Sequence, residues 1–380
     1  MFTEAHRTFL EEHGWVVIKD VVPHEVCDKA LLDIVNHYKL WNEFLDLANP
    51  DAWATKNLPP GTIHGIARCF ADTQGQWDVR QYPTVARCFA DIYRVSSVFD
   101  MVTSRDAINF YHANRPISKM AKTFWSHVDV GAHVTGPALD CVQGYVDLVG
   151  SEGLNDGTLV VWDKAHRIHK RYFEENPEAA EEAKGNWYRF TEEFMSTIEE
   201  DGSPYLSAND PHYLNAHKVP LPMKMTRVHA PKGSLVLWYS RTPHMNRGPL
   251  PPANHRCVVY VCQAPKMYLT EKDKKNRAKA WEEKRQTSHW PCFNQVKLFP
   301  IVPRLWTKEE EEEKKPKLFI MQNYFKTNPP QLTELGKSLL CSDPVPEKPK
   351  KTPSKKKTQL EKALGVSRKI TKQTTIRVHR

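Results

Sequence analysis

The sequence predicts an antiparallel, mainly β core that closes into a jelly roll or cupin-like barrel, with helices before and after it. Two observations carry this prediction. Between about residues 105 and 265, short runs rich in β-branched and aromatic residues alternate with turn signals such as Asn155-Asp156-Gly157. No regular helical segment joins successive runs, as the crossovers of a parallel sheet would require. A barrel of this kind has an open end that accommodates a small ligand.

The residues before the barrel alternate between helix and strand. Thr3 can cap a predicted helix over residues 3–13, and Gly14 ends it. The β-branched run at residues 15–19 predicts a strand. Pro23 begins a second predicted helix, in which apolar residues recur at helical spacing. We expect this opening to serve core packing, and it predicts no chemistry.

The next segment is less regular. Residues 45–85 are rich in proline, glycine and aspartate, whereas residues 82–100 predict a helix that ends near Asp100. The hexapeptide Ala-Arg-Cys-Phe-Ala-Asp occurs twice, at 67–72 and at 86–91. Two copies with different flanking residues are too few for a repeat architecture, so this echo predicts no fold.

The barrel strands are recognised by their composition. They are expected at residues 107–112, 124–130, 142–149, 157–162, 227–230, 234–239 and 256–262. Residues 170–217 interrupt the series with polar, glutamate-rich stretches that contain two segments of helical pattern. We interpret them as an insertion over one face of the barrel.

Charged residues dominate the C-terminal part. Residues 268–290 predict a charged helix, and the charge run at 308–317 predicts an exposed helix or loop. The chain carries a net charge of +9, but its distribution is uneven. From Lys348 to Arg380, twelve lysines and arginines face one acid, so this segment alone carries +11 and the preceding residues carry −2. The basic character therefore belongs to a tail.

These observations predict one domain and a tail. The domain spans residues 1–342, with the barrel core at about 105–265 and a C-terminal extension at 266–342. Residues 343–380 have almost no large apolar side chains, which predicts disorder with at most a short helix around 358–365.

The composition also bears on the cellular compartment. No apolar run approaches the roughly 20 residues that span a bilayer, and the first residues lack the charged start and apolar core of a secretory signal. The eight cysteines are scattered, with no Cys-x-x-Cys pair, which favours reduced thiols over a disulfide framework. We therefore expect a cytoplasmic or nuclear protein that is not secreted.

The residues with the clearest chemistry are His127 and Asp129. Side chains two apart on a strand point to the same face, so this imidazole and carboxylate can hold one metal ion side by side. His244, just past the predicted strand at 234–239, is the candidate for a third ligand. Two histidines and one carboxylate form the facial triad of non-haem Fe(II) oxygenases, which leaves three coordination positions for a co-substrate and O₂.

The His-x-Asp pair alone is a weak signal. In a chain with 17 histidines such a triplet arises by chance, and its alternative interpretation is a strand-end histidine bonded to the neighbouring aspartate. Arg256 supports the metal interpretation, because it begins the strand that follows His244. Its planar guanidinium there can bind the far carboxylate of a dicarboxylate. 2-Oxoglutarate is such a dicarboxylate, and it would chelate Fe(II) through its 2-oxo and 1-carboxylate groups.

The chain resembles the phytanoyl-CoA dioxygenase-like family of Fe(II)/2-oxoglutarate-dependent dioxygenases over roughly residues 5–340. The motifs that carry the resemblance are Gly14-Trp15-Val16-Val17-Ile18, Trp77-Asp78-Val79-Arg80-Gln81, His127-x-Asp129, Asp156-Gly157-Thr158-Leu159-Val160-Val161, Gly233-Ser234-Leu235-Val236-Leu237-Trp238 leading to His244, Thr287-Ser288-His289-Trp290-Pro291 and Leu332-Thr333-Glu334-Leu335-Gly336. Each motif alone is unspecific, whereas the ordered set is specific.

The resemblance implies a double-stranded β-helix with iron held by His127, Asp129 and His244 and with 2-oxoglutarate held by Arg256. By position in the motif, Asn246 and Tyr145 match places that contact 2-oxoglutarate in the family, although an indole often stands where Tyr145 does. The insertion at 170–217 departs from the family pattern. Because loops over the barrel mouth decide what enters, this departure leaves the substrate open.

Other histidines and tryptophans have simpler expected roles. His166 and His169 flank a strand end, and we expect surface or supporting roles for them because the triad is already complete. His133 is near the metal pair in sequence, where it can face either solvent or substrate. The tryptophans Trp125, Trp162 and Trp238 are expected in the core.

The predicted function is hydroxylation of an organic substrate by an Fe(II)/2-oxoglutarate-dependent dioxygenase. An acyl thioester, a small metabolite, a protein side chain and a nucleobase all stay open as substrates. The alternative is a catalytically silent barrel that serves as a binding module, with the basic tail docking nucleic acid or chromatin. The tail lysines Lys350-Lys351 and Lys355-Lys356-Lys357 fit a nuclear address or solubilising disorder equally well.

Overall fold

The computed structural model describes residues 1–59, 62–69, 71–114, 124–191, 225–302 and 307–341. The chain divides into two units, Met1–Pro344 and Val345–Arg380, and the second unit lies outside the described residues. The disorder predicted for 343–380 and the short helix predicted at 358–365 therefore concern residues that the structure does not describe. The same holds for residues 192–224, which include the whole second half of the predicted insertion.

Short strands and helices alternate along the first unit. The strands are β1 (Trp15–Ile18), β2 (Ile66–Ala67), β3 (Met101–Thr103), β4 (Ile108–Tyr111), β5 (His127–Val128), β6 (Val142–Asp147), β7 (Leu159–Trp162), β8 (Tyr188–Arg189), β9 (Met225–Val228), β10 (Leu235–Tyr239), β11 (His244–Asn246), β12 (Arg256–Val261) and β13 (Gln263–Pro265). The α-helices are α1 (Glu4–His13), α2 (His24–Trp41), α3 (Gln74–Arg80), α4 (Pro83–Ile92), α5 (His169–Glu175), α6 (Pro177–Glu182), α8 (Glu271–Glu282), α9 (Lys308–Thr327) and α10 (Glu334–Leu340). Short 3₁₀ turns connect several of them.

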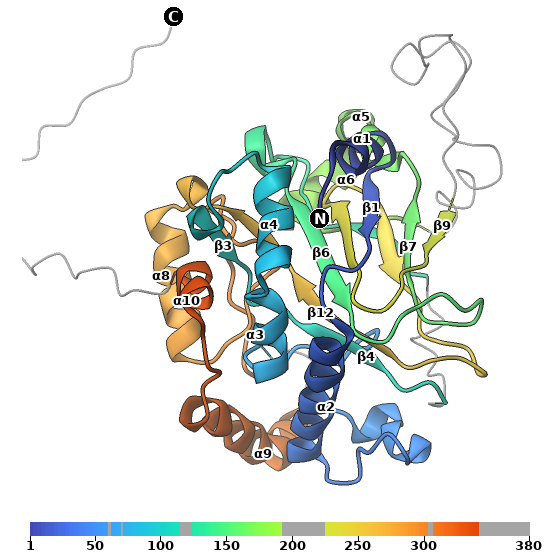
Figure 1. Ribbon diagram of the computed structural model, residues 1–380, viewed down its shortest axis with the longest axis vertical. Coiled ribbons are helices and arrows are strands. Elements are labelled where there is room, and N and C mark those ends of the chain that lie inside the picture. Colours follow the sequence, from blue (N-terminus) through green and yellow to red (C-terminus); the bar gives the residue numbers. More distant parts are fainter. Residues whose placement is uncertain (60–61, 70, 115–123, 192–224, 303–306, 342–380) are drawn as a thin grey trace, which may run out of the picture. The chain divides into compact units, whose positions relative to one another are not determined.

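Two antiparallel sheets form the core (Figure 1). The larger sheet has the strand order β1-β10-β6-β12-β4-β2, and the smaller has the order β8-β5-β11-β7-β9. Strands far apart in sequence are neighbours in both sheets, so that β10 lies between β1 and β6, and β11 lies between β5 and β7. This arrangement is the jelly-roll-like double-stranded β-helix that the sequence predicts.

Alternation of side chains along the strands separates an inner core from an outer one. On β10, Leu235 and Leu237 pack with the helices, whereas Val236 and Trp238 pack in a second cluster with residues of the smaller sheet. The two sets point in opposite directions because successive side chains of a strand face opposite sides of the sheet. The space between the sheets is thus lined by every second residue of each strand.

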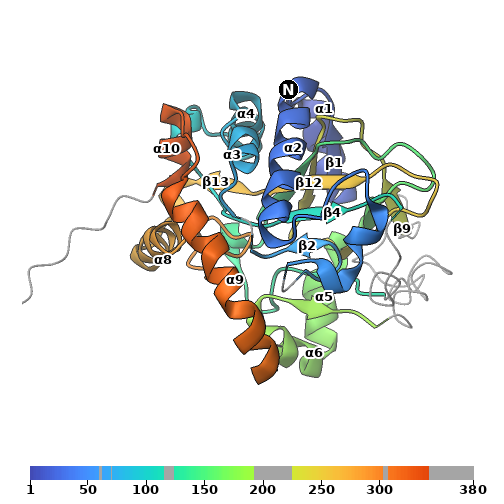
Figure 2. The ribbon, with the colours of Figure 1, turned by 90° about the horizontal axis from the view of Figure 1, so that it is seen from below.

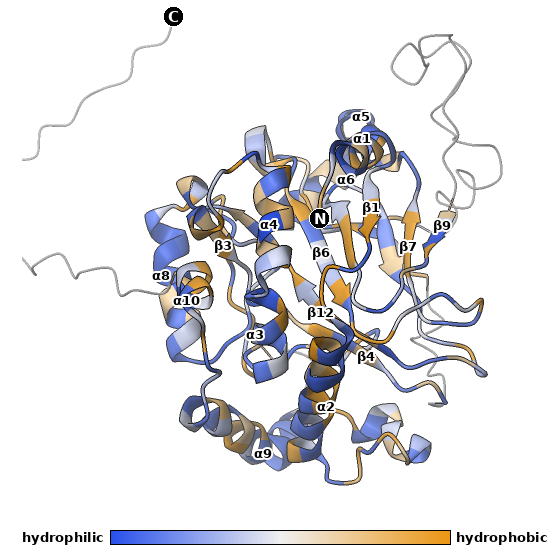
Figure 3. Ribbon diagram, viewed as in Figure 1, coloured by the Kyte–Doolittle hydropathy of each residue, from blue (hydrophilic) through white to orange (hydrophobic). Residues whose placement is uncertain are grey.

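Helices cover the outer face of each sheet. Residues of α1 to α4, α9 and α10 form one buried cluster with the outer face of the larger sheet, and α5 and α6 pack against the smaller sheet. Figure 2 shows the strands lying between these two groups of helices. Helix α8 is largely hydrophilic (Figure 3), as the predicted charged helix requires.

The N-terminal predictions are confirmed in detail. Thr3 caps α1 with its side chain, and Gly14 ends the helix in the left-handed conformation, with a φ of 83°. A glycine adopts this conformation without the steric penalty that other residues meet. Pro23 is the residue that precedes α2, as its fixed φ angle favours.

Other boundaries differ from the predictions. Helix α3 lies inside the segment predicted to be irregular, because Thr73 and Gln76 form a capping box that begins a helix there. The helix expected over 82–100 ends at Ile92, and Arg94 adopts a left-handed backbone conformation. Helix α8 ends at Glu282, so the residues up to 290 form a loop instead of helix.

Two features bear on the expected compartment. Within the part of the chain that the structure describes, no helix combines the length and the apolar character needed to cross a membrane. All eight cysteines are free thiols. The Sγ atoms of Cys141 and Cys262 are 3.7 Å apart, too far for a disulfide bond.

We predict that Gly233→Ala lowers the free energy of unfolding by about 1–3 kcal/mol. Gly233 closes the turn before β10 with a φ of 80°, and an added Cβ atom would collide with the carbonyl oxygen of Val22. Urea denaturation followed by tryptophan fluorescence measures the effect. Gly185→Ala is the matched control, because no atom lies within 4 Å of the Cβ position there. A loss of stability no larger than that of the control would contradict the prediction.

Candidate metal centre

His127 and His244 are direct neighbours across two strands. β5 and β11 run antiparallel, and their register places His127 opposite His244. The centres of the two imidazole rings are 4.3 Å apart. His244 was expected just past the predicted strand at 234–239, but it begins β11, which pairs with both β5 and β7. The strand pairing itself therefore brings the two histidines together.

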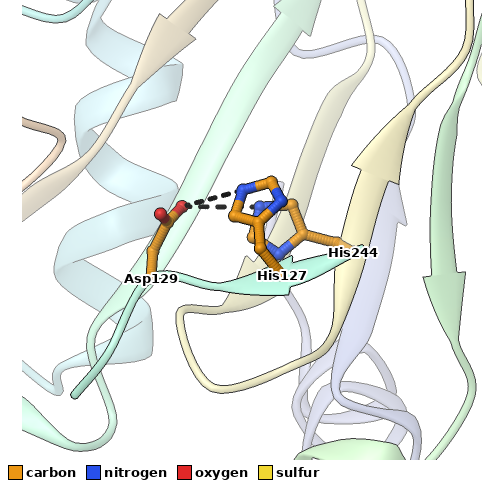
Figure 4. Close-up of side chains that lie close together, drawn as sticks. All are labelled: His127, Asp129 and His244. Atoms are coloured by element: carbon orange, nitrogen blue, oxygen red, sulfur yellow. Dashed lines mark ion pairs between the residues drawn. The ribbon is translucent and has the colours of Figure 1, made fainter. Parts of the chain in front are cut away.

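Strand alternation turns all three ligand candidates toward the space between the sheets. Val128 and Met245 belong to the outer cluster of the smaller sheet, so the residues beside them face the opposite way. Figure 4 shows the Asp129 carboxylate facing both imidazole rings. Asp129 Oδ2 lies 3.7 Å from Nε2 of His127 and 3.5 Å from Nε2 of His244.

The other nitrogen of each imidazole is fixed by the backbone. Nδ1 of His127 is 3.0 Å from the carbonyl oxygen of Trp125, and Nδ1 of His244 is 2.9 Å from that of Thr242. A carbonyl oxygen only accepts hydrogen bonds, so each Nδ1 carries the proton and each Nε2 keeps a free lone pair. Both lone pairs therefore remain available on the side of Asp129.

Asp129 lies one residue beyond the end of β5 and is held by the larger sheet. Its backbone N–H donates to the carbonyl oxygen of Ser240 at 2.9 Å, and its Oδ2 accepts a hydrogen bond from Gln143 Nε2 at 3.0 Å. Gln143 also donates to Ser240 Oγ at 3.2 Å. Gln143 precedes Tyr145 by two residues on β6, so the two side chains share a face. This spacing is the sequence signal that points to Gln143 as an inward-facing polar residue.

The environment favours the protonation states that a metal ion requires. Burial, reinforced by His244, lowers the pKa of His127 to about 3, so its imidazole is neutral at physiological pH. Burial opposes the charged form of Asp129, but the two histidines outweigh this effect and hold the pKa of its carboxyl below the usual range. A neutral imidazole and an ionised carboxylate are the forms that bind metal ions.

The donor set fits a divalent transition-metal ion. The three ligand atoms lie within 4.8 Å of one another. Bonds of about 2.1 Å place adjacent ligand atoms about 3.0–3.4 Å apart, so small side-chain movements bring the observed separations into range. Two imidazoles and one carboxylate match the facial triad that holds non-haem Fe(II).

Arg256 begins β12 and is buried in the space between the sheets. It lies two residues before Val258, a member of the inner core, and therefore faces the same way. Its Nε donates to Asn109 Oδ1 at 3.1 Å and its Nη1 to the carbonyl oxygen of Gly157 at 3.2 Å. Its Nη2 is buried and has no acceptor of good geometry among the described residues. An unsatisfied charged donor costs at least about 1–3 kcal/mol, which favours an anionic ligand at this position.

Tyr145 and Asn246 also lie in this interior space. The Arg256 guanidinium carbon is 5.1 Å from the centre of the Tyr145 ring. Burial raises the pKa of Tyr145 above its usual value, although Arg256 opposes the shift, so the hydroxyl stays protonated. Asn246 donates from Nδ2 to the carbonyl oxygen of His64 at 3.2 Å. The structure thus brings all six residues predicted from the sequence to the same side of their sheets.

Aromatic rings surround His127. Trp125 stacks on His64 at 4.0 Å and on His127 at 4.7 Å between ring centres, and its Nε1 donates to the carbonyl oxygen of Asn246. Trp125 packs against the core as expected, and it is only partly buried. Its stacking on His127 also supports the orientation of a ligand candidate. Trp187, next to β8, lies 5.8 Å from the His127 ring and is 47% exposed.

The remaining histidines named in the sequence analysis lie outside the cluster. His166 is buried with its Nε2 near the carbonyl oxygen of Glu11, and His169 bonds the carbonyl oxygen of Val130. Their supporting roles agree with the expectation. His133 is exposed and is not part of the metal-ligand cluster.

Comparisons with known proteins give distant similarities. No protein-family profile matches the chain. The Ava biosynthesis cluster protein O of Aspergillus versicolor is 23% identical over 307 residues, which cover 76% of this chain and 84% of that protein. Identity at this level does not assign the chain to a family.

Two solved structures illustrate the structural similarity. GlcNAc Inducible Gene 2, GIG2 (DUF1479), from Candida albicans is 14% identical with a TM-score of 0.48, and the match covers 91% of this chain and 77% of that one. The epimerase SnoN, solved in complex with Fe3+, alpha ketoglutarate and nogalamycin RO, is 13% identical with a TM-score of 0.38, covering 69% of this chain and 83% of that one. The chemistry of this chain therefore has to follow from its own residues.

We predict that His127→Ala, Asp129→Ala and His244→Ala each lower the affinity for Fe(II) by more than about 100-fold, because each removes a direct ligand and not an outer partner. Anaerobic equilibrium dialysis with iron quantified by mass spectrometry measures the affinity. His133→Ala is the control and should bind iron as the wild type does, because this histidine is exposed and lies outside the cluster. Undiminished iron occupancy in Asp129→Ala would refute the ligand assignment.

Replacement of the supporting amide should have a smaller effect. We predict that Gln143→Leu weakens Fe(II) binding by about 10-fold, because the Asp129 carboxylate loses the hydrogen bond that orients it. The same dialysis measures the change, and circular dichroism verifies that the variant is folded. An affinity equal to that of the wild type would show that Asp129 is oriented without Gln143.

Proposed function

We propose that this protein is a non-haem Fe(II)/2-oxoglutarate-dependent dioxygenase that hydroxylates a small organic substrate. The observation that carries the proposal is the buried Arg256, which faces the same interior space as His127, Asp129 and His244. A triad alone fits several kinds of metalloprotein, whereas a triad with a buried guanidinium facing the same interior space fits a dicarboxylate that chelates the metal.

Each residue has a separate task in this reaction. His127, Asp129 and His244 would hold the iron on one face and leave the opposite face for 2-oxoglutarate and O₂. Iron with these co-substrates supplies the oxidative decarboxylation that yields succinate and CO₂ and the transfer of one oxygen atom to a C–H bond of the substrate. Arg256 would bind the 5-carboxylate, so that the 2-oxo and 1-carboxylate groups face the metal.

Burial supports the role of Arg256. The guanidinium is 2% exposed and already uses two of its donor groups, so a carboxylate bound at Nη2 would meet a fixed, dehydrated cation. Tyr145 stays protonated and can donate a second hydrogen bond to the same carboxylate. Asn246, next to His244 on the inward face, is a further polar group for the co-substrate.

The side of the centre that opens to solvent suggests where substrate enters. The side chains of His127 and His244 are both 7% exposed, whereas that of Asp129 is 19% exposed. The exposed indole of Trp187 lies beside His127 and offers an apolar surface to an organic substrate. The relative from Aspergillus versicolor is named as a biosynthesis cluster protein, which favours a small molecule over a protein or nucleic acid.

We predict that the Fe(II)-loaded protein converts 2-oxoglutarate to succinate, and that Arg256→Ala raises the KM for 2-oxoglutarate by about 100-fold, since a buried charge pair is lost. Succinate is quantified by mass spectrometry, and iron binding should stay unchanged in this variant. Arg241→Ala is the control, because that arginine is paired with Asp140, whose side chain is 59% exposed. Equal KM values in the two variants would remove Arg256 from the co-substrate site.

The alternative, a silent barrel with a nucleic-acid-binding tail, is tested by deleting residues 348–380. A dioxygenase should retain iron binding and succinate formation after the deletion. Loss of every biochemical activity would favour the binding module. The substrate itself can be sought as a mass gain of one oxygen in a metabolite extract, with His127→Ala as the inactive comparison.

A further inference from the structure

His289 belongs to the loop that follows α8, and the residue after it, Trp290, shares a buried cluster with the residue after Asp129. The backbone N–H of Thr287 donates to the carbonyl oxygen of Arg105 at 2.9 Å, and that of Arg105 donates to Thr287 Oγ1 at 3.1 Å. On the other side, Trp290 is buried in a cluster with Val130, the residue after Asp129. The loop is therefore fixed on both sides of His289.

A second set of contacts holds the same loop. The Ser288 N–H donates to the carbonyl oxygen of Lys297 at 2.8 Å, and Ser288 Oγ donates to that of Gln295 at 3.3 Å. Asn186, beside the exposed Trp187, donates to Gln295 Oε1. The C-terminal extension and the described part of the insertion thus meet at the side of the barrel where the metal ligands lie.

The imidazole of His289 has an unused nitrogen. Its Nε2 is buried and has no hydrogen-bond partner in the described part of the chain. Arg256 Nη2 is likewise buried without a hydrogen-bond partner among the described residues. Native proteins satisfy most buried polar groups, so an unpartnered nitrogen on each of these two side chains favours a polar ligand that completes both.

The charge state suits such a ligand. Burial lowers the pKa of His289 to about 4, with Asp129 opposing the shift and His244 adding to it. A neutral imidazole can donate its N–H to an anionic oxygen without placing a full positive charge beside a divalent cation.

We propose that Nε2–H of His289 donates a hydrogen bond to the 1-carboxylate of 2-oxoglutarate, the group that chelates the metal. The inference rests on the proposed function. The co-substrate would then be held at its far carboxylate by Arg256, from the barrel, and at its near carboxylate by His289, from the C-terminal extension. The extension would be part of the binding site instead of a mere cover for the barrel.

Anaerobic titration of the Fe(II)-loaded full chain tests the proposal. The charge-transfer absorption of the Fe(II)–2-oxoglutarate chelate reports binding without turnover. We expect His289→Ala to weaken 2-oxoglutarate binding by about 10-fold, the effect of one hydrogen bond to a charged group, and to leave iron affinity unchanged. His289→Gln, which keeps an N–H near the position of Nε2, should recover part of the loss, and exposed His229→Ala should have no effect.

Pyruvate separates the two ends of the co-substrate. It has the 1-carboxylate and the 2-oxo group but lacks the 5-carboxylate. We therefore expect His289→Ala to weaken pyruvate binding by the same factor as 2-oxoglutarate binding, whereas Arg256→Ala should weaken 2-oxoglutarate binding alone.

Three results would overturn the proposal. The first is 2-oxoglutarate affinity in His289→Ala within about twofold of the wild type, against the tenfold expected from the lost bond. The second is a loss of iron affinity in this variant, which would mean that His289 acts through the metal ligands. The third is unchanged pyruvate binding. If His289→Ala does not fold, His289→Leu and His289→Gln carry the same comparison. Failure of the wild type to bind iron or 2-oxoglutarate would instead refute the proposed function, and this inference with it.

Discussion

The pairing of His127 with His244 is the contact on which the rest of the centre depends. Because β5 and β11 place these residues opposite each other, the two imidazoles lie side by side between the sheets. The register is held from behind, where Val128 and Met245 pack with α5 and α6. A slip by one residue would turn the histidines outward and bury the wrong side chains, so the hydrophobic contacts of the outer face fix the metal site on the inner face.

The interior between the sheets combines apolar walls with a few strong charges. Val236, Trp238 and Val258 exclude water. Arg256 donates hydrogen bonds to Gly157 and Asn109, and Asp129 donates to Ser240 and accepts from Gln143. A buried cation and a largely enclosed carboxylate are costly unless each meets a partner. A metal ion beside Asp129 and a carboxylate beside Arg256 would supply both partners. The Asp129 carboxylate and the Arg256 guanidinium would then belong to one binding site.

Much of the fold and the direct ligand candidates could be predicted, because they depend on local patterns. Strand alternation placed His127 and Asp129 on one face, and β-branched runs located most strands, though β5 is shorter than expected. The supporting residues could not be found in this way. Gln143 reaches Asp129 from another sheet, and His289 arrives on a loop that was predicted to be helix. Their contacts depend on strand order and loop packing, which no local pattern encodes.

The repeated hexapeptide shows that a local sequence does not always determine the backbone conformation. At 86–91 it lies wholly within α4, whereas residues 67–69 form the end of β2 and a turn. The same letters take two conformations because Ala67 pairs with β4 while the second copy packs one helical face into the core. Local sequence patterns are enough to predict the capped N-terminal helix, the alternation of the strands and the chemical types of the donors. Which strands become neighbours, and therefore which side chains meet, depends on the fold as a whole, because burial and pairing with distant residues outweigh local preference.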